Sequence, residues 1–116
     1  MIDAKTIVKV AVKAAEEKKG SDIVLLNISK KSVIADYFLI ISGANERQVT
    51  ALTDEIEDSL AKEKIFPKSV EGRKGNQWIL LDYGDVVIHV FHSESRAFYD
   101  LERIWRDAER IDPNTL

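Results

Sequence analysis

The sequence contains no cysteine, no long apolar run and no glycine-rich phosphate-binding loop. The absence of cysteine excludes a disulfide framework and any metal site built from thiolates, and it favours a reducing compartment. A membrane-spanning helix needs roughly 20 apolar residues in succession, and no segment approaches that length. Near the N-terminus, Lys5, Lys9 and Lys13 interrupt the apolar positions before a secretory signal can form. We therefore expect a cytoplasmic protein that does not contact a membrane.

The chain also lacks the excess of basic residues that general nucleic-acid binding requires, because its formal net charge is -3. The charge is uneven, with seven lysines against four acids in residues 1–31 and eight acids against four arginines in residues 82–116. An acidic C-terminal third would be steered towards a basic partner. The alternative is that these charges form a solvated surface and nothing more.

A length of 116 residues fits one compact domain, which we place at residues 1–116 with a frayed tail at 113–116 after Pro113. Helical spacing of apolar residues and runs of β-branched residues predict the elements in order. They are a helix at 3–19, strands at 23–28 and 37–42, a helix from Asn45 to about Lys64, strands at 69–71, 78–82 and 85–91, and a helical region from Ser93 to Pro113.

Local signals sharpen this prediction at two places. Asn45 with Gln48 has the spacing of a helix N-cap and its partner. Residues 37–42 are almost continuously apolar, which is typical of a strand buried on both faces. A strand, a glycine and a long helix in succession predict a βα unit, so we expect an α/β fold: a mixed β-sheet with flanking helices.

Candidate catalytic and metal-binding groups occur in the last third, but their spacing argues against such chemistry. His89 and His92 should point to opposite faces of their strand, so they would not chelate one ion. Asp82 and Asp85 flank the turn at Tyr83-Gly84 instead of forming the same-face pair that holds two metal ions. There is no Gly-x-Ser-x-Gly elbow. We expect no catalytic residue, no metal and no cofactor, and so no enzyme.

Two loops invite a nucleic-acid or nucleotide interpretation. Residues 43–46 follow a buried strand and begin a helix, yet they lack repeated glycines, and Glu46 would repel a phosphate. Residues 72–75 match the Gly-x-x-Gly loop that clamps nucleic-acid backbone in KH domains, where it joins two helices. Here the loop precedes a strand, so either a plain connection or a minor contact with RNA is open.

The predicted hairpin at 78–91 offers a face of mixed chemistry. Alternation puts Ile79 and Leu81 on one side, and Trp78, Asp82, Val87 and His89 on the other. If no helix covers this second set, its composition suits a protein-binding patch. The alternative is that Trp78 completes the core together with Trp105.

Three groups of residues then form a familiar pattern in order along nearly the whole chain. The first runs from Ala35-Asp36-Tyr37-Phe38 through Ser42-Gly43 to Arg47-Gln48-Val49. The second comprises Glu71-Gly72, Trp78, Leu81-Asp82, Gly84 to Val87 and His89 to Phe91. The third comprises Glu94, Arg96, Tyr99, Leu101-Glu102 and Trp105. Together they resemble the signatures of the ribosomal silencing factor (Iojap-like) family.

The resemblance implies a fold akin to nucleotidyltransferases without their catalytic carboxylate set. It further implies binding to the large ribosomal subunit through large-subunit ribosomal protein fourteen. The bound protein would block the small subunit and repress translation when nutrients are scarce, and relatives in organelles are linked to ribosome biogenesis. An exposed aromatic face could also form a homodimer. The residues implied for partner binding are Trp78, Leu81, Asp82, Asp85, Val87, His89, Tyr99, Leu101, Glu102 and Trp105.

Overall fold

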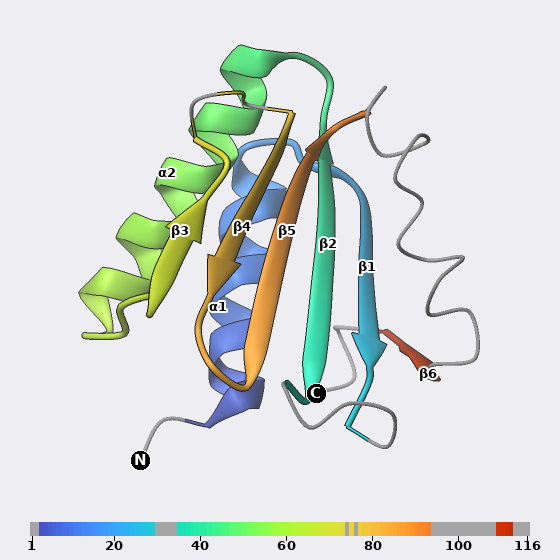
Figure 1. Ribbon diagram of the computed structural model, residues 1–116, viewed down its shortest axis with the longest axis vertical. Coiled ribbons are helices and arrows are strands. Elements are labelled where there is room, and N and C mark those ends of the chain that lie inside the picture. The colour runs from blue at the N-terminus through green and yellow to red at the C-terminus, as the bar shows by residue number, and fades with distance from the viewer. Residues whose placement is uncertain (1–2, 30–34, 74, 76, 94–108, 113–116) are drawn as a thin grey trace.

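In the described part of the chain, one mixed sheet carries two helices on the same face (Figure 1). The computed structural model describes residues 3–29, 35–73, 75, 77–93 and 109–112. The elements in chain order are α1 (Ala4–Glu17), β1 (Ser21–Asn27), β2 (Tyr37–Gly43), α2 (Glu46–Lys62), β3 (Ser69–Glu71), β4 (Trp78–Asp82), β5 (Val86–His92) and β6 (Glu109–Ile111).

Within the described residues the sheet has six strands in the order β3-β4-β5-β2-β1-β6. β2 and β5 run parallel, and every other neighbouring pair is antiparallel. The parallel pair requires a crossover, which α2 supplies together with β3 and β4. The α/β class, the mixed sheet and the antiparallel β4–β5 hairpin are thus confirmed. The likeness to nucleotidyltransferases stays a prediction.

Both helices form where the sequence predicts them, and their caps have clear chemical causes. The Asp3 side chain accepts a hydrogen bond from Lys5 N at 3.0 Å. The Asn45 side chain accepts one from Gln48 N at 2.8 Å, which confirms the predicted N-cap. In a capping box, the Gln48 side chain would accept a hydrogen bond from the backbone N–H of the N-cap residue, Asn45. Here Gln48 Oε1 instead accepts from the N–H of the preceding residue, Ala44, at 2.6 Å. The Gln48 amide also donates to the carbonyl oxygens of residues 18 and 19, which ties the start of α2 to the end of α1.

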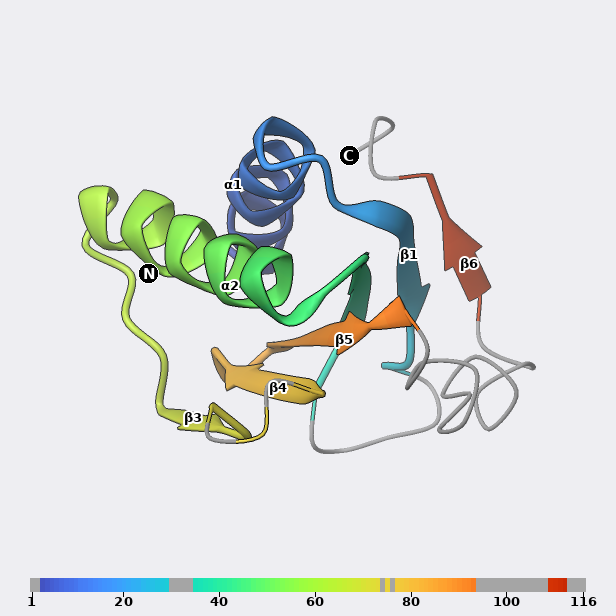
Figure 2. The same ribbon diagram turned by 90° about the horizontal axis from the view of Figure 1, so that it is seen from above.

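Both helices cover the same face of the sheet (Figure 2). Their apolar stripes bury strand residues such as Leu39, Ile41 and Ile88. A second cluster lies on the opposite face and includes Ile40 and Val87. Because β2 contributes to both clusters, the prediction that this strand is buried on both faces is confirmed. None of the helices in the described part of the chain is long and apolar enough to cross a membrane.

The C-terminal region differs from the prediction in one respect. We expected a helical region that continues to Pro113, but residues 109–111 form β6 and pair antiparallel with β1, with Leu25 opposite Ile111. Pairing satisfies backbone groups along the outer side of β1, and this long-range gain outweighs the local helical pattern. The rest of the predicted helix, with Leu101, Ile104, Trp105 and Ala108, and the tail at 113–116 lie outside the described residues.

Candidate docking surface

The hairpin of β4 and β5 separates its side chains between the two faces of the sheet. Ile79 and Leu81 are fully buried on the face that the helices cover. Trp78, Leu80 and Asp82, which alternate with them, are half-buried. The predicted alternation along β4 is therefore confirmed, and it places Trp78 and Asp82 on the side away from the helices.

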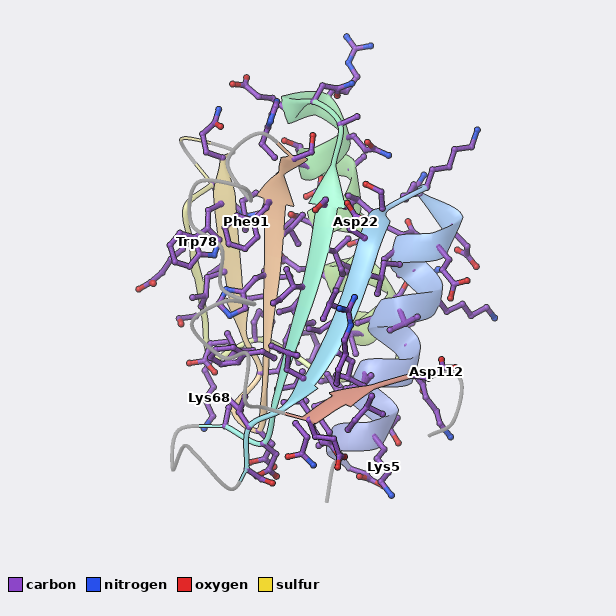
Figure 3. All side chains as sticks on the ribbon, turned by 90° about the vertical axis from the view of Figure 1, so that its right-hand side faces the viewer. Lys5, Asp22, Lys68, Trp78, Phe91 and Asp112 are labelled. Atoms are coloured by element: carbon purple, nitrogen blue, oxygen red, sulfur yellow. The ribbon has the colours of Figure 1, made fainter. Side chains whose placement is uncertain are left out.

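Four rings gather on that side, from three adjacent strands, and we call Phe38, Trp78, His89 and Phe91 the aromatic cluster. Trp78 and Phe91 stand opposite each other in the β4–β5 register, and their rings stack with centroids 5.1 Å apart and planes 19° apart (Figure 3). Phe38 meets His89 edge to face at 4.8 Å. Such contacts add to the gain from burial, so the cluster is stabilised beyond what its apolar area alone would give.

His89 is the polar member of the aromatic cluster, and it is 3% exposed. Trp78 Nε1 donates a hydrogen bond to His89 Nδ1 at 3.0 Å. Burial lowers the pKa of His89 from 6.5 to about 4, so the imidazole is neutral near pH 7. Because Nδ1 accepts a hydrogen bond, the proton of the neutral ring resides on Nε2. His89 Nε2 is buried and has no hydrogen-bond partner among the described residues.

This arrangement does not suit a metal ion. The Nδ1 lone pair of His89 is engaged by the indole, and the described residues contain no cluster of three or more histidine, aspartate or glutamate side chains able to hold a metal ion. His92 lies apart from His89 and lines a surface pocket of about 550 Å³ with Asn45, Glu46 and Arg47. The two histidines are thus separated, as strand alternation predicts.

At the other end of the hairpin the two aspartates have different surroundings. Asp82 Oδ1 accepts a hydrogen bond from Gly84 N at 2.8 Å, in a turn where Gly84 has φ +86°. Asp85 is exposed, and its carbonyl oxygen accepts hydrogen bonds from the backbone N–H groups of residues 36 and 37. The interpretation of Asp82 and Asp85 as turn residues, and not a metal-holding pair, is therefore consistent with the geometry.

Some residues expected at a partner contact lie elsewhere. Leu81 is 0% exposed beneath the helices, so the expectation that it contacts a partner is wrong: strand alternation turns it into the core. Val87 and His89 are also buried, at 6% and 3% exposure, and they support the aromatic cluster from within. The remaining expected contacts lie outside the described residues: Tyr99, Leu101, Glu102 and Trp105.

The Gly-x-x-Gly loop connects two strands, β3 and β4, and not two helices. Arg73 in this loop pairs with Glu57 and, at 3.2 Å, with Asp54, both on α2. Partial burial opposes ionisation, but the hydrogen bonds and charges of these two carboxylates raise the pKa of Arg73. A guanidinium held by two carboxylates is poorly placed to hold a phosphate. The geometry favours a plain connection over an RNA clamp.

Sequence reasoning missed two aromatic residues, one in the aromatic cluster and one elsewhere on the surface. Phe38 joins the aromatic cluster because β2 pairs with β5, a long-range pairing that periodicity alone does not reveal. Phe66, in the loop after α2, is 67% exposed, and among the described residues it is the exposed large hydrophobic side chain. No periodic pattern in the sequence marks Phe66 as exposed.

The chain matches one family model over its full length and known proteins over most of its length. The family model described as "Ribosomal silencing factor during starvation" matches residues 1–116. The Bacillus subtilis protein named ribosomal silencing factor RsfS is 41% identical over 111 residues, which cover 96% of this chain and 94% of that protein. A crystal structure of a Chromobacterium violaceum protein superposes with a TM-score of 0.86 at 34% identity, covering 90% of this chain and 87% of that one. A mouse protein named "Mitochondrial assembly of ribosomal large subunit protein 1" is 27% identical over 107 residues, covering 90% of this chain and 47% of that protein.

Proposed function

Because the chain belongs to the RsfS family of ribosomal silencing factors, we propose that it binds the large ribosomal subunit and keeps the small subunit from joining. The observation that carries the proposal is the match of the family model over residues 1–116. The contact on the ribosome is large-subunit ribosomal protein fourteen. The result is lower translation in the cytoplasm when nutrients are limited.

The docking surface that we propose centres on Trp78. Tryptophan is favoured as a binding anchor because one rigid ring brings a large contact area and loses little conformational entropy. Trp78 is half-buried and stacked on Phe91, which supports this role. The carboxylates of Asp82 and Asp85 would pair with basic groups of the ribosomal protein. Tyr99, Leu101, Glu102 and Trp105 belong to the proposal on sequence grounds.

The mechanism is steric and involves no bond chemistry, catalytic residue or cofactor. A protein that binds the free large subunit but not the joined ribosome shifts the joining equilibrium by mass action. At about 100 times its dissociation constant, the shift is about 2.7 kcal/mol, which is roughly a hundredfold. Repression therefore requires affinity and a blocking position, both of which a small rigid protein can supply.

The proposal also includes a role in assembly, a minor contact with ribosomal RNA and a homodimer. The name of the mouse relative supports a role for the same contact in assembly of the large subunit. A homodimer through the aromatic face would compete with docking. A minor contact with ribosomal RNA would add to it. The uneven charge of the sequence supports a protein over RNA as the main partner, since residues 82–116 are acidic.

The test is sedimentation of the purified chain with separated ribosomal subunits, followed by light scattering of subunit joining. We expect co-sedimentation with the large subunit alone and slower joining in its presence. Trp78→Ala should weaken binding, whereas Phe66→Ala is the matched control because it removes an exposed aromatic ring elsewhere. Binding to the small subunit instead, or unhindered joining at saturating protein, contradicts the proposal. Pull-down with isolated ribosomal protein fourteen then tests the named contact without RNA.

A further inference from the structure

Trp78 can serve as an anchor only if its indole is already oriented when a partner arrives. Ordering a flexible side chain at an interface costs conformational entropy, and pre-orientation removes that cost. Stacking on Phe91 restrains the plane of the indole, with 19° between the rings. Stacking by itself does not set the rotation of the indole within that plane. A second restraint of a different kind is therefore needed.

His89 supplies the second restraint through the hydrogen bond from Trp78 Nε1 to His89 Nδ1 at 3.0 Å. This bond fixes the edge of the indole that carries the N–H group, and so it fixes the rotation that stacking leaves open. The acceptor is available because the imidazole is neutral and its proton resides on Nε2.

The imidazole is itself held firmly. His89 lies on β5, between β4 and β2, and is 3% exposed. Its ring packs edge to face against Phe38 at 4.8 Å and parallel to Phe91 at 6.2 Å with 14° between the planes. His89 Nε2 is buried without a hydrogen-bond partner among the described residues, which costs stability. A leucine would fill the space without that cost, so the imidazole is explained better by what Nδ1 does.

We propose that His89 is a positioning residue for docking: it does not touch the partner but orients the Trp78 indole as the anchor. The proposal rests on the proposed function, since it assigns Trp78 to the docking surface. It differs from the expectation drawn from the sequence, in which His89 contacts the partner directly.

The experiment is a double-mutant cycle read by affinity for the large subunit. His89→Leu removes the acceptor and keeps an apolar filling. His89→Asn keeps an acceptor, because its side-chain oxygen stands on the same atom position as Nδ1. Trp78→Phe keeps a ring and removes the donor. Indole N–H resonances, with Trp78 assigned through Trp78→Phe, report the hydrogen bond without the ribosome, and thermal unfolding verifies that each variant folds.

We expect His89→Leu to weaken binding about three- to tenfold, as loss of one hydrogen bond implies. His89→Asn should restore most of the affinity, and His89→Leu should add nothing in the Trp78→Phe background. The Trp78 indole resonance should shift in His89→Leu.

Three results would overturn the positioning role alone: an unchanged indole resonance in His89→Leu, an equal loss of affinity in the Trp78→Phe background, or failure of His89→Asn to restore binding. A wild-type chain that does not bind the large subunit would instead overturn the proposed function, and the docking role of His89 with it. The resonance still reports the hydrogen bond in that case, so the two failures are distinguishable.

Discussion

Oδ1 of Asp82 accepts a hydrogen bond of 2.8 Å from the backbone N–H of Gly84 and thereby holds the turn between β4 and β5. Gly84 has φ +86°, a left-handed conformation that glycine adopts without the cost that a side chain would add. Asp82 thus stabilises the turn in addition to the docking role that we propose for it. A charge-reversing substitution at Asp82 would disturb the turn and the surface charge together.

Two substitutions at Asp82 separate these roles. Asp82→Asn keeps an oxygen that can accept from Gly84 and removes the charge, so its unfolding free energy should stay near that of the wild type. Its association with the large subunit should slow, most clearly at low salt, because charge complementarity acts mainly on the association rate. Asp82→Ala loses the acceptor and should cost about 1 kcal/mol of stability in denaturant unfolding.

Asp85→Asn is the matched control for stability alone, because it removes an exposed charge from the same turn. It should leave stability unchanged in denaturant unfolding. If stopped-flow association of Asp82→Asn at low salt equals that of the wild type, the charge of Asp82 has no part in docking.

Gly72 and Gly75 lie in the same loop and provide a second pair of variants. Gly72 has φ +90°, and a Cβ atom there would stand 2.0 Å from the backbone oxygen of Trp78. Gly72→Ala should therefore cost at least about 2 kcal/mol of unfolding free energy, from backbone strain and displacement of the start of β4. A Cβ atom at Gly75 meets nothing within 4 Å, so Gly75→Ala should be neutral. Equal urea unfolding midpoints for the two variants would contradict the prediction that only Gly72 requires glycine.

Features that depend on neighbours in sequence were predictable. The cap at Asn45 and the alternation of Ile79 and Leu81 with Trp78 follow from spacing alone. The turn at Tyr83-Gly84 also sets the register of the hairpin, in which Leu80 opposes His89. In that register Trp78 and His89 are diagonal neighbours on one face of the sheet. Their contact could therefore have been predicted from the sequence.

Features that depend on long-range pairing were not predictable from one sequence. Phe38 reaches His89 only because β2 pairs with β5. Similarly, β6 forms only because β1 offers it a strand edge for antiparallel pairing. The contact of Arg73 with Glu57 depends on how α2 crosses the sheet. His89 is only 3% exposed because of packing on its face, and alternation does not determine that packing. For that reason the sequence predicted a contact residue at a position whose side chain is buried.

The burial of His89 makes the stability of the fold depend on pH. Because burial lowers the pKa of His89 from 6.5 to about 4, the unfolded chain binds more protons than the folded chain between these values. Stability therefore rises with pH through this window and is lost as pH falls from 6.5 towards 4. The contribution of this one group is about 3 kcal/mol, since each unit of pKa difference corresponds to about 1.4 kcal/mol.

His89→Leu is the control for this prediction, because it removes the titrating group and leaves the carboxylates in place. Urea unfolding at several pH values should show a loss between pH 6.5 and 4 that is smaller in the variant than in the wild type by about 3 kcal/mol. If the plots of unfolding free energy against pH run parallel for the two proteins, His89 binds protons equally in the folded and unfolded states.

Arg73 links the β3–β4 loop to α2 through Glu57 and Asp54, and its side chain is 42% exposed. Exposed ion pairs contribute about 0–1 kcal/mol after solvent screening, so Arg73→Ala should cost less than about 1 kcal/mol, and salt should reduce that cost. Arg73→Lys should restore only part of it, because an ammonium cannot present the planar fork that a guanidinium offers two carboxylates. Glu57→Gln completes a double-mutant cycle in urea unfolding, in which the Arg73–Glu57 coupling should fade at high salt.

Arg73→Ala also tests the remaining RNA interpretation of the loop. A guanidinium engaged by two carboxylates should contribute nothing to RNA affinity, so Arg73→Ala should leave binding of a single-stranded RNA unchanged at every salt concentration; a weaker affinity with a shallower salt dependence would instead assign the loop to phosphate contact.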